Sequence, residues 1–124
     1  MVRKYAMIGA FVALLAVVLG AFGAHMLEER ISEDDLKTFE TGVRYQMYHG
    51  LGILLVALLG DRFGSGKNLL WAGRLLVVGV ILFSGSLYGL SLTGLTFFGP
   101  ITPLGGASFI AGWICAILGA RKTE

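Results

Sequence analysis

The stretch YAMIGAFVALLAVVLGAFGAHML, residues 5–27, decides the fold class of this 124-residue chain. It contains no Asp, Glu, Lys or Arg, and the hydrocarbon core of a bilayer needs about 20 residues of helix to cross it. Arg3 and Lys4 before it, and Ala21-Phe22-Gly23 near its end, also resemble parts of a signal peptide. Because the apolar stretch is longer than the ~7–15 residues usual in such a peptide, we expect it to be retained as a transmembrane helix.

Three more apolar runs follow, so that the expected spans cover residues 5–27, 45–60, 68–92 and 103–120. The chain is 56% apolar and 15% charged, whereas soluble domains carry about a quarter charged residues. Lipid offers no partner for unpaired backbone groups, so each span is expected to be a helix. The connections are short, which makes sequential helices antiparallel. The predicted fold is therefore an all-α polytopic membrane protein, a four-transmembrane-helix up-down bundle that forms one domain.

The second helix is expected to extend beyond its span at the N-terminal end. Ser32 is a typical N-cap, and the acidic residues that follow it suit a first turn because the helix dipole favours negative charge there. Apolar residues then recur at helical spacing through Val43. The pattern predicts an extramembrane helical extension over residues 33–44 that continues into the second span.

Lysine and arginine are distributed unevenly along the chain. Of the ten such residues, seven lie at the two termini and in or near the second connection, and three lie in the first connection. Membrane proteins concentrate these cations on the cytoplasmic side, so both termini are expected to be cytoplasmic. The formal net charge is only +2 and the cations form no single patch, which argues against nucleic acid as a partner.

The chain has 19 glycines, and most of them lie inside the expected spans. Apolar surface does not drive helices together in lipid, so small residues that allow close backbone approach take that role. Pairs spaced four apart, such as Gly20 with Ala24 and Gly85 with Gly89, lie on one helix face. The residues expected to pack helices are Gly20, Ala24, Gly85, Gly89, Gly105, Gly106 and Gly112. Such close packing leaves little room for a wide aqueous pore.

Polar side chains gather near the outer ends of the first three spans. In an antiparallel hairpin, His25 at the end of the first span and His49 near the start of the second are expected at similar depth. The predicted outer-leaflet polar cluster contains His25, Arg44, Tyr45, Gln46, His49, Ser84, Ser86 and Tyr88. These groups could bond between helices and fix their register, or they could form a ligand site, because ionisable groups within membranes are functional candidates. Axial haem ligation by the two histidines is a further alternative.

Motifs of the common enzyme classes do not occur in the sequence. It has no Walker loop, HExxH or GxSxG, so we do not expect an enzyme. No carboxylate lies within the spans, and the single cysteine, Cys115, is a small hydrophobe in an apolar run, so we expect no metal site and no cofactor. The favoured function is a non-enzymatic binding, assembly or accessory module that contacts lipid and forms a homo-oligomer or binds another membrane protein. The alternatives are a small transporter or a lipid- or solute-binding protein, and then a haem or quinone protein.

Four motifs, in order along the chain, resemble a known family. They are GAFGAH (20–25), FETGVRYQMYHGLG (39–52), LFSGSLYGL (82–90), and ITPLGG (101–106) followed by Gly112-Trp113. Together they are similar to the domain of unknown function 423 family, also called transmembrane protein 256-like small membrane proteins. The resemblance covers nearly the whole chain and implies four membrane helices and, in bacteria, the inner membrane, with no established activity. The motif residues match at His25, Tyr45, Gln46, His49, Ser84, Gly85, Ser86, Tyr88, Pro103, Gly105 and Gly106.

Overall fold

The computed structural model describes residues 2–64 and 66–121, which are helical apart from short connections and include no strand. The helices are α1 (Val2–Val18), α2 (Ala24–Leu27), α3 (Glu33–Phe63), α4 (Lys67–Gly79), α5 (Gly85–Thr93) and α6 (Ile101–Ala120). Two π-helical turns, Leu19–Gly23 and Val80–Ser84, join α1 to α2 and α4 to α5 as continuous rods. A short 3-10 turn, Thr96–Phe98, precedes α6. The predicted all-helical class is confirmed.

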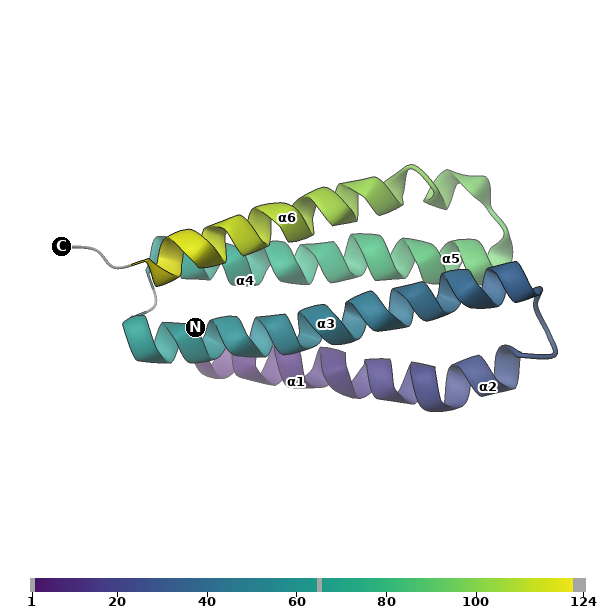
Figure 1. Ribbon diagram of the computed structural model, residues 1–124, viewed down its shortest axis with the longest axis horizontal. Helices are drawn as coiled ribbons and strands as arrows, with labels where there is room; N and C mark the ends of the chain where they lie inside the picture. The colour runs from purple at the N-terminus through teal and green to yellow at the C-terminus, as the bar shows by residue number, and fades with distance from the viewer. Residues whose placement is uncertain (1, 65, 122–124) are drawn as a thin grey trace.

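The rods lie side by side along one long axis (Figure 1). In the structure, α1 packs on α3, α6 packs on α4, and α3 joins the two pairs through its contacts with α4 and α5. The turn between α2 and α3 and the connection between α5 and α6 lie at one end of the molecule, which we call the outer end. The end of α3, the start of α4 and the end of α6 lie at the opposite, inner end.

Three of these helical runs are long and apolar enough to cross a membrane, namely Val2–Leu27, Lys67–Thr93 and Thr96–Ala120. They coincide with the first, third and fourth expected spans. The remaining helix, α3, is 31 residues long. Its first half is charged and polar, so α3 differs from the other three in composition although not in length.

The start of α3 follows from its sequence. Ser32 accepts a hydrogen bond from the backbone N–H of Asp35 at 3.0 Å, and Glu33, Asp34 and Asp35 occupy the first turn. The side-chain oxygen satisfies one of the N–H groups that a helix start leaves free, and the acids face the positive end of the helix dipole. The helix therefore begins at Glu33, where the acidic first turn predicted it.

Close backbone contact between α1 and α3 depends on two glycines. A Cβ added at Gly9 would lie 2.6 Å from the backbone nitrogen of Leu54, and one added at Gly50 would lie 2.8 Å from the backbone nitrogen of Ala13. Neither contact is compatible with a side chain, so the crossing needs glycine on both helices. This is the close approach through small residues that membrane helices use in place of hydrophobic association.

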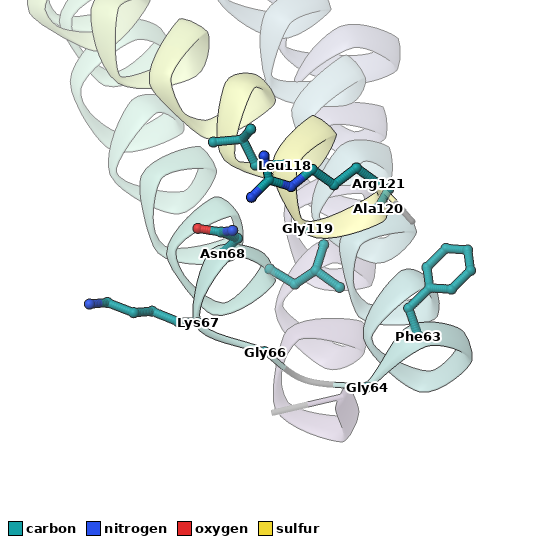
Figure 2. A pocket seen from close by; sticks show the side chains of 10 residues that line it. Phe63, Gly64, Gly66, Lys67, Asn68, Leu118, Gly119, Ala120 and Arg121 are labelled. Atoms are coloured by element: carbon teal, nitrogen blue, oxygen red, sulfur yellow. The ribbon is translucent and has the colours of Figure 1, made fainter. Parts of the chain in front are cut away.

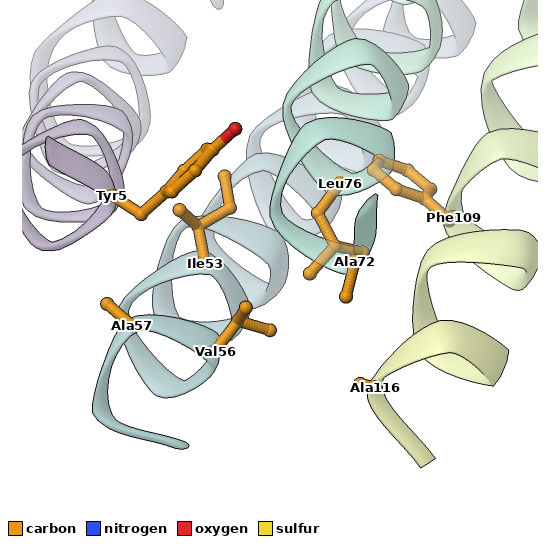
Figure 3. Close-up of a cluster of buried hydrophobic side chains, with 8 residues drawn as sticks. All are labelled: Tyr5, Ile53, Val56, Ala57, Ala72, Leu76, Phe109 and Ala116. Carbon is orange, nitrogen blue, oxygen red and sulfur yellow. The ribbon is translucent and has the colours of Figure 1, made fainter. Parts of the chain in front are cut away.

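A cluster of buried apolar side chains joins the helices of the bundle. The buried cluster draws its members from α1, α3, α4 and α6 (Figure 3). It consists of Tyr5, Ile53, Val56, Ala57, Ala72, Leu76, Phe109 and Ala116. The buried polar side chains are Gln46, His49, Ser84, Ser86 and Ser91, and most of them belong to the candidate site.

The glycines expected to pack helices divide into two groups. Gly105 lies against the backbone of Phe83, and Gly112 lies against the side chain of Leu76. The ring of Phe98 covers Gly89, and Val43 lies beside Gly20. Ala24 is partly buried on α2. Gly85 and Gly106 have open space at the Cβ position, with nothing within 4 Å, so the structure does not place these two at a contact within the chain.

Candidate functional site

Two turns of α3 carry the polar groups that connect it to every other rod. We call the set formed by Gly42, Gln46 and His49 of α3 with their partners Ser84, Tyr88 and Trp113 the polar belt. Its hydrogen bonds run from α3 to α1, to the rod of α4 and α5, and to α6.

Gln46 is the member of the polar belt that bonds to two neighbours at once. Its side chain is 5% exposed. The amide Nε2 donates to the carbonyl oxygen of Val12 in α1 at 3.0 Å, and Oε1 accepts a hydrogen bond from the hydroxyl of Tyr88 in α5 at 2.5 Å. The amide of a glutamine can donate through its nitrogen and accept through its oxygen. This one residue therefore fixes the position of α3 relative to two other rods.

His49 connects α3 to α6. The imidazole is stacked on the ring of Phe109 with 3.5 Å between centroids, and its Nε2 lies 3.0 Å from Nε1 of Trp113. An indole N–H can only donate, so Nε2 must be the unprotonated acceptor. The proton of the neutral ring is then on Nδ1, which donates to the carbonyl oxygen of Tyr45 at 2.8 Å. Both ring nitrogens are used within the protein.

Ser84 belongs to the π-helical turn and connects it to α3. Its hydroxyl donates to the carbonyl oxygen of Gly42 at 2.7 Å. Nearby, the hydroxyl of Ser86 lies 2.5 Å from that of Thr102 in α6. Among the described residues, no buried side-chain nitrogen or oxygen lacks a hydrogen-bond partner. Each such bond between membrane helices contributes about 0.6 kcal/mol on average, and together they fix the register of the bundle.

The prediction that His25 and His49 lie at similar depth is wrong. The side chain of His25 is 84% exposed, and its nearest charged neighbour is Glu28, at 3.7 Å from Nδ1 to Oε2. The reason is the long N-terminal part of α3, which already packs on the outer part of the first rod, where Gly23 meets Phe39. His49 lies 16 residues after Glu33, or about 24 Å along the helix. The two imidazoles are therefore apart, and they cannot ligate one haem axially.

Arg44 and Tyr45 lie beside the polar belt and are largely outside its bonds. Arg44 is exposed, and its Nη2 donates to the hydroxyl of Thr41 at 3.0 Å. The side chain of Tyr45 is 37% exposed and packs on Phe83, with 4.6 Å between ring centroids. Of the eight residues of the predicted cluster, the structure therefore joins five by side-chain bonds within the bundle: Gln46, His49, Ser84, Ser86 and Tyr88.

Trp113 and Phe109 complete the site and were not among the predicted site residues. Trp113 carries an N–H group in the middle of an apolar helix, and a buried indole N–H usually finds a partner. That requirement was the available signal, because an indole N–H needs an acceptor and His49 is an imidazole inside the second span. Ser108 is a further connection that was not predicted, since its hydroxyl donates to the carbonyl oxygen of Leu75 at 2.6 Å and ties α6 to α4.

Two surface hollows lie away from the polar belt. The larger, about 850 Å³, is at the inner end between α4 and α6 (Figure 2). The smaller, about 470 Å³, is at the outer end around His25 and Arg30. Within residues 2–64 and 66–121, no three His, Cys, Asp or Glu side chains are grouped so that they could hold a metal ion.

Sequence comparison identifies a family and several relatives of the chain. The family model described as "Protein of unknown function (DUF423)" matches residues 19–106. The UPF0382 membrane protein YwdK of Bacillus subtilis (strain 168) is 48% identical over 120 residues, which is 97% of this chain and 98% of that protein. UPF0382 membrane proteins of Staphylococcus haemolyticus and Staphylococcus aureus (strain bovine RF122 / ET3-1) are 43% and 44% identical, each over 97% of both chains. No solved structure gives a significant match.

Proposed function

Since the chain belongs to the DUF423 family of membrane proteins of unknown function, we propose from its geometry that it is a non-enzymatic assembly or accessory module. It would be a stiff four-span bundle that acts through its outer surface. The observation that carries this proposal is the fully bonded polar belt. A group that reacts with a substrate or binds a solute must be free to do so, whereas the polar side chains of the belt are used between helices.

The fourth span of this proposal is α3. Its buried face carries Gln46 and His49, which lower its average hydropathy, but its outward face is different. Exposed residues follow one another at helical spacing as Arg44, Tyr48, Leu51, Leu55, Leu58 and Arg62. The two arginines are 18 residues apart, or about 27 Å, which is close to the ~30 Å thickness of the hydrocarbon core. An apolar stripe with a cation at each end is what a lipid-facing helix needs, because each arginine can reach a headgroup layer.

The direction of the bundle in the membrane is proposed from its charges. The inner end holds most of the lysine and arginine residues, and such cations concentrate on the cytoplasmic side. Both termini would then be cytoplasmic, and the acidic first turn of α3 would face outward. In a bacterium, the corresponding membrane is the inner membrane.

The surface available for a partner includes two glycines that have no packing role within the chain. Gly85 and Gly106 leave open space at their Cβ positions, and small residues permit close approach of a second helix in lipid. We propose that the partner is a second copy of the chain or another membrane protein, which would account for glycines that no intrachain contact requires.

The test is the state of the protein in the membrane. Cells expressing the tagged chain are cross-linked before solubilisation in mild detergent, and the products are sized and identified. We expect a defined oligomer or a defined heteromer, which weakens when Gly85→Leu and Gly106→Leu are introduced together. A chain recovered only as a monomer, before and after the substitutions, contradicts the proposal.

A further inference from the structure

The larger hollow at the inner end is formed by the ends of three helices. Its wall combines Phe63 and Gly64 at the end of α3 with Gly66, the start of α4 and the last turn of α6 (Figure 2). The lining residues are Phe63, Gly64, Gly66, Lys67, Asn68, Leu69, Leu118, Gly119, Ala120 and Arg121. The side chain of Leu69 in α4 lies against Gly119 of α6 and sets the distance between these two helices. At about 850 Å³, the hollow is large enough for a small charged group with part of an apolar chain.

Among the described residues that line the hollow, the charged ones are both cations. Lys67 and Arg121 come from different helices, and none of the lining residues is an acid. Neither cation forms an ion pair with any residue that the structure describes. In the view of Figure 2, Arg121 extends from α6 toward the side on which Asn68 lies. An arginine can meet a phosphate with two parallel N–H donors, and a lysine can add a point charge.

The remaining wall is apolar and adjoins the lipid-facing surface. Phe63 is 55% exposed and Leu118 is 37% exposed, so both are available to acyl chains. A free phosphate ion would make no favourable contact with such an apolar wall, whereas a phospholipid presents a charged headgroup joined to apolar chains. Basic pockets between transmembrane helices on the cytoplasmic side are suited to anionic headgroups, because that leaflet carries a negative surface potential.

We propose that this hollow is a binding site for an anionic phospholipid of the inner leaflet, with the phosphate held by Arg121 and with Lys67, which extends outward in Figure 2, adding positive charge at the edge. Asn68 supplies an amide for the polar part of the headgroup, and Phe63 and Leu118 border the acyl chains. The placement in the inner leaflet rests on the orientation given under the proposed function. The binding itself depends only on the hollow.

The test is lipid retention by the purified chain. The protein in mild detergent is titrated with phosphatidylglycerol or with phosphatidylcholine, and bound lipid is counted by native mass spectrometry on the monomer peak. Lys67→Gln with Arg121→Gln is compared with Arg3→Gln with Lys4→Gln, which removes the same charge at the same end of the molecule. At about 1 kcal/mol for each cation, we expect the first pair to weaken phosphatidylglycerol binding about 30-fold and the control pair to change it little. Equal effects of the two pairs, or equal binding of the two lipids, overturn the proposal.

Two further arms separate the alternatives. Inorganic phosphate and glycerol phosphate are added as competitors, and we expect neither to displace the lipid at millimolar concentration. Displacement by phosphate alone would mean a site for a free anion and would overturn the lipid assignment. The single substitutions Lys67→Gln and Arg121→Gln are measured with the melting temperature of each variant, so that loss of lipid is scored only in folded protein. Because the monomer is counted, failure to find a protein partner leaves this result unaffected.

Discussion

At the scale of the residue, Gln46 shows what a polar side chain does when it is buried between helices. It lies on the buried face of α3 and bonds to the α1 backbone and to Tyr88. In a medium without water, the alternative to these bonds is an unsatisfied amide, which is costly. The residue therefore selects one arrangement of helices among the many that apolar surfaces alone would allow.

Replacing Tyr88 with phenylalanine tests this role of Gln46. The change removes the hydroxyl that donates to Oε1 and leaves the ring in place, so we expect a loss of about 0.6–1.7 kcal/mol in unfolding free energy. The measurement is reversible unfolding in mixed detergent and SDS micelles. Tyr48→Phe is the control, because Tyr48 is 55% exposed, and it should have little effect. In a double-mutant cycle with Gln46→Leu, additive losses would contradict a direct bond.

The tautomer of His49 is a second prediction at this scale. Because the indole of Trp113 donates to Nε2, the neutral ring should carry its proton on Nδ1. The chemical shifts of the two ring nitrogens in a ¹⁵N-histidine sample identify the tautomer, and His25 in the same sample serves as an exposed reference. Trp113→Phe should remove the preference by taking away the donor. A proton on Nε2 in the unsubstituted protein would refute the assigned bond.

Five of the eight residues that the sequence groups into a cluster are joined by hydrogen bonds in the structure, but one histidine of the eight lies elsewhere. Gln46, His49, Ser84 and Tyr88 were recognised because polar groups within apolar runs are rare. A second span that begins at residue 45 places His49 level with His25, whereas α3 begins at Glu33 and already packs on the first rod. The error is one of register, since depth depends on how two helices slide past each other, and that follows from contacts such as Gly9 with Gly50.

At the scale of the element, α3 is the helix around which the others are arranged. It contacts α1 on one side and α4 and α5 on another, and it reaches α6 through His49. The extent of α3 could be predicted from its N-cap, its acidic first turn and its apolar spacing, all of which are local signals. The π-helical turns could not be predicted in this way, because neither has a side-chain cap or a charged residue to mark it.

Helix packing through glycine gives the next prediction. A Cβ at Gly105 would lie 2.7 Å from Cα of Phe83, whereas one at Gly106 meets nothing within 4 Å. We expect Gly105→Ala to destabilise the protein by about 1–3 kcal/mol through overpacking. Gly106→Ala should be neutral or slightly stabilising, because alanine favours a helix more than glycine does. Thermal unfolding of the two variants in detergent compares neighbours that the sequence alone did not distinguish. Equal losses would contradict the described packing of α6 on the rod of α4 and α5.

The N-cap of α3 supports a separate prediction. Ser32→Ala removes the acceptor for the backbone N–H of Asp35 and should cost about 1 kcal/mol at the outer end of the helix. Hydrogen exchange should become faster over residues 33–36, while the inner half of α3 stays protected by its packing. Ser32→Asp keeps an acceptor and should restore slow exchange. Exchange that is equally slow in the alanine variant would show that the cap contributes nothing to the start of α3.

At the scale of the whole molecule, a buried apolar cluster and the polar belt together hold the bundle, and they meet where Phe109 stacks on His49. In the proposed account the protein acts through its surface, with open space at Gly85 and Gly106 and a basic hollow at the inner end. The general architecture could be predicted from composition, because long uncharged runs have few alternatives to membrane helices. The hollow could not, because its residues come from three separate elements that only the folded chain brings together.

The central claim is that α3 crosses the membrane as the fourth helix of the bundle, and labelling at its two ends tests that claim most directly. Single cysteines replace Lys37 and Arg62, both exposed, in a chain carrying Cys115→Ala. A membrane-impermeant maleimide is then applied to intact spheroplasts and to permeabilised ones. We predict that Lys37→Cys is labelled in both and that Arg62→Cys is labelled only after permeabilisation. Labelling of both positions from the same side of the intact membrane would contradict the account.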